Sequence, residues 1–348
     1  MTILDTTEVE LDTIITHHVG NKLNDEKYHL SNEETILDTI TCSYLLKLFL
    51  SPLKPEEFYS FTHPISLEFN DVYKLVAGLF ADMGDFIAVS QNIAKLLYDH
   101  SMHPKIKEGE LNIVYFTNVM IDNEVVDAIG IFKSETNVPF IKMNSRKASY
   151  EINHDFGYEI KSPDKGCVIF NTDQEGGYKI LLIDTTRKAE EAQYWKDDFL
   201  KLKPISNDFL QTKQFLSIAK DFVANKLAEE YEVSKADKID YLNKSLEYFK
   251  NNDNFDKKDF EETVFQDKGL IESFRNFDEQ YKAENNFEIA DSFEISTSAV
   301  KKQTRVFKSV LKLDKNFHVY IHGNKDLIEQ GIDKDGRKFY KLYYEEEE

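Results

Sequence analysis

The sequence is poor in the residues that mark disulfide scaffolds, fibres and membrane spans. Its 348 residues include only 2 cysteines, 13 glycines and 7 prolines. Cys42 and Cys167 lie far apart and form no Cys-x-x-Cys pattern, which argues against both a disulfide framework and a structural zinc site. The most apolar helix-length run, residues 36–50, is interrupted by Asp38 and Lys47 and is too short to cross a bilayer. We therefore expect a globular protein that does not enter a membrane.

Basic residues are also scarce relative to acidic ones. The chain has 43 Lys and Arg against 63 Asp and Glu, a formal charge of −20. Attraction to nucleic acid or to anionic lipid therefore needs a local basic patch, because the whole molecule repels phosphate. The first twelve residues hold four acids and no base, the reverse of a signal peptide. These features predict a cytoplasmic protein in a reducing compartment.

In the first part of the chain, helical spacing of apolar residues follows one short strand. Residues 13–19 are apolar and β-branched, which predicts a strand. Ser31 and Glu34 form a capping-box pattern that predicts a helix over the following residues, ended by Pro52. Helical spacing predicts two more helices at 70–81 and 86–98.

After residue 104 the apolar period becomes two, which indicates strands. Residues 111–116 and 125–132 flank Asp122 and Asn123 and predict a hairpin. Further strands are expected at 140–143, 150–153, 166–171 and 178–184, with Gly176 and Gly177 as a tight connection. Because no helix separates these strands, they predict an antiparallel meander and an α+β fold instead of a doubly wound parallel sheet.

Helical spacing returns beyond residue 190 and gives way to strands near the end of the chain. Helices are expected at 206–231, 235–250, 257–266 and 269–284. Alternation over 306–321 and 338–344 predicts a small terminal sheet. We therefore predict an α+β domain of residues 1–206, and a helical domain of residues 207–348 that is closed by a small β-sheet.

The motifs of common enzymes are missing from the sequence. It has no phosphate-binding loop, no nucleophile elbow and no dinucleotide-binding turn. Asp127 and the tripeptide from Glu159 to Lys161 resemble the acidic-residue and lysine layout of metal-dependent nucleases, but such tripeptides are common in a chain with 30% charged residues. The pairs His17-His18 and His100-x-x-His103 lack further ligands for zinc. We expect no catalysis, no cofactor and no metal, with a nuclease as an alternative.

Charge is distributed unevenly in the second half of the chain. Residues 261–294 hold ten acids and three bases, whereas 301–315 hold six bases and one acid. Basic side chains in such a group can bind DNA phosphates, although a solvated strand face is the explanation that we favour over nucleic-acid contact. The candidate DNA-binding residues are Lys301, Lys302, Arg305, Lys308 and Lys312. A second, weaker group, expected on a loop between strands, is Lys142, Arg146 and Lys147.

Several segments together resemble the bacterial NdpA-like family of nucleoid-associated proteins, especially its Bacteroidetes-type members. The similarity covers nearly the whole chain, and its specificity comes from the order and spacing of the motifs. The segments are residues 17–22, 70–74, 93–98, 103–107, 126–133, 165–171, 322–323 and 338–343.

The resemblance implies a cytoplasmic, nucleoid-associated protein without catalytic activity. It implies contact with double-stranded DNA, either directly or through a partner such as a DNA topoisomerase or another nucleoid protein, and it allows an oligomer. The family supplies no DNA-binding residues that can be transferred to this chain. A second class of function therefore stays open, in which the acidic helical block is a protein-interaction module that imitates the charge of DNA.

Overall fold

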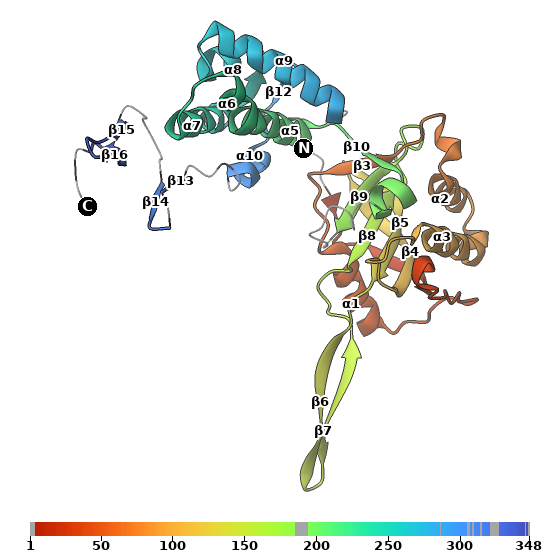
Figure 1. The fold of residues 1–348 in the computed structure, drawn as a ribbon. Coiled ribbons are helices and arrows are strands. Elements are labelled where there is room, and N and C mark those ends of the chain that lie inside the picture. Colours follow the sequence, from red (N-terminus) through yellow and green to blue (C-terminus); the bar gives the residue numbers. More distant parts are fainter. Residues whose placement is uncertain are drawn as a thin grey trace. The chain divides into compact units, whose positions relative to one another are not determined.

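The computed structural model describes residues 4–184, 194–285, 287–304, 307, 310–313, 315–320, 327–344 and 346. The chain divides into two compact units, Met1–Ile205 and Ser206–Glu348. Helices and antiparallel sheets occur in both units, which confirms the predicted α+β class (Figure 1). Among the helices of the described residues, none is long and apolar enough to span a bilayer.

The first unit is built on one antiparallel sheet. Its strands follow the order β1-β4-β5-β8-β9-β3-β10, and β2 also pairs with β4. The bounds are β1 (Leu4–Asp5), β2 (Glu10–Val19), β3 (Phe58–Phe61), β4 (Gly109–Ile121), β5 (Glu124–Ser134), β8 (Lys165–Phe170), β9 (Lys179–Asp184) and β10 (Leu202–Pro204).

Helices bury both faces of this sheet. On one face, α2 (Asp71–Ala81), α3 (Phe86–His100) and the short η4 (Tyr194–Phe199) share a core with Ile113 and Tyr115 of β4. On the other face, α1 (Thr39–Leu50) packs with Val114 and Phe116 of the same strand. Successive residues of a strand point to opposite faces, so the central strands must be apolar at almost every position.

The predicted helices at 70–81 and 86–98 are confirmed by α2 and α3, and the predicted hairpin is confirmed by β4 and β5. Asp122 and Asn123 have positive φ angles of 51° and 67°, as the favoured two-residue hairpin turn requires. Gly177 has φ +96°, and a Cβ there would lie 2.5 Å from the carbonyl oxygen of Phe61. The tight connection at this position therefore needs glycine.

The predicted start of the first helix is wrong. Ser31 caps no helix, because its hydroxyl donates to the carbonyl of Thr16 at 2.5 Å and its backbone N–H donates to Nδ1 of His17. These bonds hold the segment against β2. The carboxylate of Asp38 accepts from the N–H groups of Ile40 and Thr41, so α1 begins at Thr39.

The predicted meander is interrupted. β5 pairs directly with β8, while β6 (Val138–Arg146) and β7 (Ser149–Gly157) form a separate two-stranded sheet that projects from the unit (Figure 1). The physical reason lies in composition, since nearly every residue of β6 and β7 is exposed, whereas every residue of β8 is buried. Strands that alternate polar and apolar residues do not fit into a sheet covered on both faces.

The second unit is mainly helical, with a core rich in phenylalanine. The ring of Phe215 contacts those of Phe249, Phe255, Phe260 and Phe274. The bounds are α5 (Asp208–Asp221), η5 (Phe222–Lys226), α6 (Leu227–Glu230), α7 (Lys235–Asn251), β11 (Asn254–Asp256), α8 (Lys257–Val264), α9 (Lys268–Asn285), β12 (Ser292–Glu294) and α10 (Thr297–Thr304). The predicted helical block is confirmed, whereas α10 was not predicted.

The terminal strands form two hairpins instead of the expected single sheet. β13 (Val310–Leu313) pairs with β14 (Phe317–Tyr320), and β15 (Ile328–Ile332) pairs with β16 (Lys338–Leu342). Each strand pairs with its neighbour in sequence, for which the entropy cost of closing the connection is small. Leu311 of β13 is buried against Ile239 of α7.

Candidate nucleic-acid interface

The separate hairpin of β6, β7 and their turn, which we call the arm, carries one of the two predicted basic groups. Its register pairs Lys142 with Asn153 and Met143 with Ile152. Directly paired residues lie on the same face of an antiparallel ribbon, and successive residues alternate between faces. The arm therefore has a polar face and an apolar face. The polar face holds Phe140, Lys142, Asn144, Arg146, Glu151, Asn153 and Asp155, and the apolar face holds Pro139, Ile141, Met143, Ser145, Tyr150, Ile152, His154 and Phe156.

A network of polar groups beside the buried Lys133 fixes the root of the arm to the sheet. The carboxylate of Asp164 accepts from the backbone N–H groups of Glu135 and Thr136, at 2.6 and 3.1 Å. The carboxylate of Glu135 pairs with the ammonium of Lys133 at 3.0 Å and accepts from the hydroxyl of Tyr194. Lys133 is fully buried, and burial lowers its pKa. Its ion pair with Glu135 acts in the opposite direction and offsets part of the cost of burying the charged ammonium.

Lys142 and Arg146 lie in β6, and Lys147 lies in the turn at the tip of the arm, which corrects the expected loop placement of this group. The sequence missed that β6 extends to Arg146, because polar residues end its apolar alternation early. The structure brings the three basic residues together along one ribbon, where all three are exposed.

Two acids on the polar face accompany these bases. The ammonium of Lys142 lies 2.6 Å from the carboxylate of Asp155, and Nε of Arg146 donates to the carboxylate of Glu151 at 2.9 Å. Hydrogen bonds from the two bases lower the pKa values of both carboxyl groups. These pairings could not be predicted from the sequence, because they depend on the register of the hairpin.

The larger basic group lies partly on a helix, not on the strand edge that was expected. Lys301 and Lys302 lie in the last turn of α10 and are exposed. The ammonium of Lys302 lies 4.6 Å from the ring centroid of Phe209 in α5. Arg305 and Lys308 lie outside the described residues, and Lys312 belongs to β13. Basic side chains near a helix C-terminus are favoured by the helix dipole, which offers a structural reason for part of this group.

The acidic segment before this group contains internal ion pairs. The buried carboxylate of Glu261 pairs with Arg275 at 2.6 Å. The buried carboxylate of Asp278 pairs with Lys257 and Lys282, at 2.6 and 3.0 Å. The remaining eight acids are exposed: Glu262, Asp267, Glu272, Glu279, Glu284, Glu288, Asp291 and Glu294. Two of the ten acids are thus buried in ion pairs, and eight are exposed.

The residues of the nuclease alternative lie in different parts of the first unit. Asp127 of β5 accepts from the hydroxyl of Tyr115 at 2.8 Å, and its carbonyl accepts from the residue that follows β8. Glu159 and Lys161 lie in the connection that enters β8 at its other end. Among the described residues, no group of three or more His, Cys, Asp or Glu side chains could hold a metal ion.

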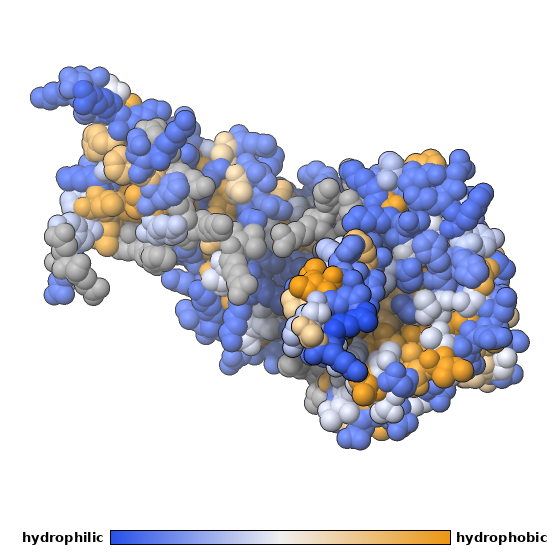
Figure 2. All heavy atoms as spheres, turned by 90° about the horizontal axis from the view of Figure 1, so that it is seen from below, coloured by the Kyte–Doolittle hydropathy of each residue, from blue (hydrophilic) through white to orange (hydrophobic). Residues whose placement is uncertain are grey.

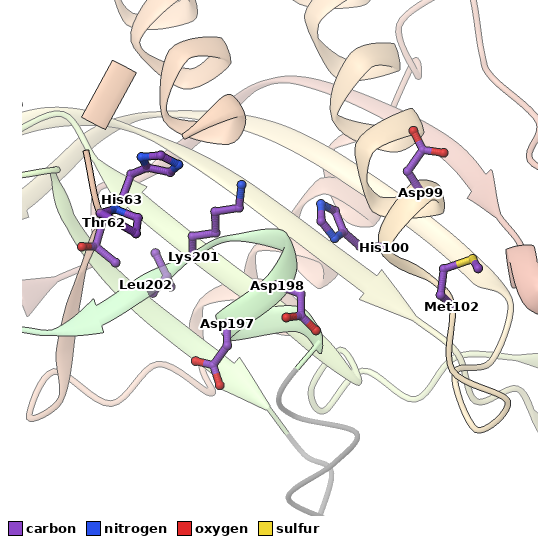
Figure 3. Close-up of a pocket in the computed structure, with 10 residues that line it drawn as sticks. Thr62, His63, Asp99, His100, Met102, Asp197, Asp198, Lys201 and Leu202 are labelled. Atoms are coloured by element: carbon purple, nitrogen blue, oxygen red, sulfur yellow. The ribbon is translucent and has the colours of Figure 1, made fainter. Parts of the chain in front are cut away.

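A pocket of about 580 Å³ opens in the first unit near the C-terminus of α3. Its lining includes His63, His100, Lys201 and the acids Asp197 and Asp198 of η4 (Figure 3). Burial and the nearby ammonium of Lys201 lower the pKa of His100, so its imidazole is neutral at neutral pH. The lining mixes both signs of charge and selects no ligand class.

Comparison with known proteins identifies one family. A family model described as nucleoid-associated protein YejK matches residues 15–336. No curated protein matches the sequence. The matched range covers most of both units, with the arm and both basic groups, and it confirms the resemblance to nucleoid-associated proteins that the sequence motifs indicated.

Proposed function

Because this chain belongs to the family of nucleoid-associated protein YejK, we propose that it reaches the nucleoid by contacting double-stranded DNA directly and without catalysis. Such a protein works in the cytoplasm, where the nucleoid lies. The contact would lie at the two basic groups, with the arm as the principal one.

The observation that carries the proposal is the arm, which presents Lys142, Arg146 and Lys147 on a ribbon that stands clear of the sheet. Each of its strands has nine residues. At about 3.3 Å per residue, the arm is about 30 Å long. A two-stranded ribbon fits the major groove of DNA, which is about 12 Å wide. The arm can therefore follow a groove while its basic residues meet the flanking phosphates.

The ion pairs on the polar face do not prevent this contact. The side chains of Lys142 and Arg146 are 49% and 65% exposed, as ion pairs at the surface are. Exposed pairs of this kind contribute little to stability, because water and salt screen them. A DNA phosphate can therefore compete with Asp155 and Glu151 for the two bases, and Lys147 at the tip adds a third positive charge.

The group around Lys301 and Lys302 would supply further phosphate contacts, and the charge of −20 would keep the total affinity low. Contacts to phosphate carry no sequence information, so binding should tolerate any base sequence.

A second candidate is a protein-interaction module that reaches DNA through a partner such as a topoisomerase. It is favoured by the eight exposed acids of the acidic segment, which could imitate the charge of DNA. In direct association DNA itself holds the chain to the nucleoid, whereas in indirect association a partner protein does.

Two experiments distinguish the candidates. Purified chain should shift a DNA duplex in a gel at low salt, which requires no partner. In addition, chain captured from lysate should lose its nucleoid proteins when the lysate is treated with nuclease. No shift by the purified chain, together with partners that survive nuclease treatment, would replace direct contact by the interaction module.

A further inference from the structure

The apolar face of the arm is exposed along the whole ribbon. Ile141, Met143, Tyr150, Ile152 and Phe156 are each 60% to 70% exposed. In Figure 2 the arm points toward the viewer. Hydrophobic residues, in orange, lie on one side of it, and hydrophilic residues, in blue, lie on the other. Contiguous apolar surface of this kind on a soluble protein usually marks an interaction site.

The two faces of the arm differ in charge and therefore in the kind of partner that each can bind. On the polar face, Lys142 forms an ion pair with Asp155, and Arg146 forms one with Glu151. The apolar face carries no lysine, arginine, aspartate or glutamate, and a two-stranded ribbon alone is at best marginally stable in water. A partner for this face must therefore present apolar surface.

We infer that the apolar face of the arm binds the apolar face of the arm of a second copy of this chain, forming a two-fold symmetric dimer. An isologous contact needs one self-complementary patch. The apolar face meets this condition, because two such faces, which carry no lysine, arginine, aspartate or glutamate, can stack without bringing like charges together. The polar faces then point outward on both sides of the stack.

The area of the face is sufficient for such a dimer. Five side chains that are 60% to 70% exposed present roughly 100 Å² each, or about 500 Å² per copy. Two copies would bury about 1,000 Å² in total, which is about the lower limit for a specific interface. The dimer should therefore form reversibly.

Charge also favours this arrangement. Each chain carries a charge of −20, so two copies repel one another over most of their surface. The arm holds three bases and two acids, so two arms do not share in this repulsion. Its length of about 30 Å exceeds the screening length of about 8 Å at physiological ionic strength, so contact through the arms allows the acidic bodies to stay apart.

DNA is a poorer occupant of the apolar face. The face offers phosphate only the polar groups of Ser145, Tyr150 and His154, whereas all three basic residues lie on the polar face or in the turn. An anionic membrane surface would likewise require basic residues beside the apolar ones.

The test is sedimentation velocity of the purified full-length chain, without DNA, over a series of concentrations. Wild type should convert from monomer to dimer as the concentration rises. Met143→Ser with Ile152→Ser shortens four side chains of the interface and should weaken dimerisation by about 100-fold or more. The matched control, Asn144→Ser with Asn153→Ser on the polar face, should change it by no more than about twofold.

The fold of each variant is checked by the fluorescence of Trp195, which is buried in the core of the first unit. A wild type that stays monomeric, or a Met143→Ser, Ile152→Ser variant that dimerises as wild type does, would overturn the inference. So would a monomeric wild type whose DNA affinity falls in that variant, because the face would then be a wedge for DNA. The absence of DNA keeps this result separate from the proposed DNA contact.

Discussion

The stability of the first unit should depend on the protonation of His17. His17 belongs to β2, and its side chain is 1% exposed and faces Ser90 of α3. Its Nδ1 accepts the backbone N–H of Ser31 at 3.1 Å, so the proton of the neutral ring is on Nε2, which lies 3.0 Å from the hydroxyl of Ser90. Burial, together with the nearby His29, lowers the pKa of His17 to about 4. A second proton on Nδ1 would face the N–H of Ser31.

The magnitude follows from the difference in pKa between the two states. The unfolded chain binds a proton at His17 near pH 6.5, whereas the folded chain does so only near pH 4. Because the unfolded state binds more protons between these values, stability is complete above pH 6.5 and falls as the pH falls toward 4. Lowering the pH from 7 to 5 should therefore cost about 2 kcal/mol in the free energy of unfolding through this residue alone.

Urea unfolding monitored by tryptophan fluorescence measures this effect. The chain has one tryptophan, Trp195, so the signal reports the first unit. His17→Asn keeps a polar group but does not titrate, and should lose about 2 kcal/mol of the difference between pH 7 and pH 5. His154→Asn, which replaces an exposed histidine of the arm, should keep that difference. An equal pH dependence in wild type and His17→Asn would refute the reasoning.

Three further predictions concern packing, independence and chemistry. Gly109→Ala should destabilise the first unit by about 1 to 3 kcal/mol, because the new Cβ would lie 2.1 Å from a carbonyl oxygen of β5. Gly78→Ala, in open space on α2, should instead stabilise it by up to about 1 kcal/mol, both measured by urea unfolding. A fragment of residues 1–205 should fold with the Trp195 emission of the full chain, and emission typical of exposed tryptophan would contradict this. Plasmid incubated with Mg²⁺ or Mn²⁺ should stay supercoiled, whereas nicking lost in Asp127→Ala and Glu159→Ala would establish a nuclease.

The sequence predicted the elements whose signals are local. The helices α2 and α3 follow from apolar spacing, and Asn70 caps α2 by accepting the N–H of Tyr73. The hairpin of β4 and β5 follows from the polar pair at its turn. The start of α1 was wrong because Ser31 matches a capping box but is engaged by β2 through long-range bonds. Local patterns do not reveal such competing partners.

The candidate site was only partly predictable for the same reason. The bases Lys142, Arg146 and Lys147 were identified from charge. Their placement on a projecting ribbon was not, because it depends on β5 pairing with β8 and excluding the strands between them. The two faces of the arm also depend on register, which separates Lys142 from Met143 although they are adjacent in sequence.

The most direct test of direct DNA contact is the salt dependence of binding by the purified chain. Each phosphate contact contributes about −0.9 to the slope of log K against log salt, so three or four contacts give about −3 to −4. We expect a flatter slope in two triple variants. The first combines Lys142→Ala, Arg146→Ala and Lys147→Ala, and the second combines Lys301→Ala, Lys302→Ala and Arg305→Ala. Wild type that fails to bind DNA, or a slope unchanged in both triple variants, would contradict contact through these groups.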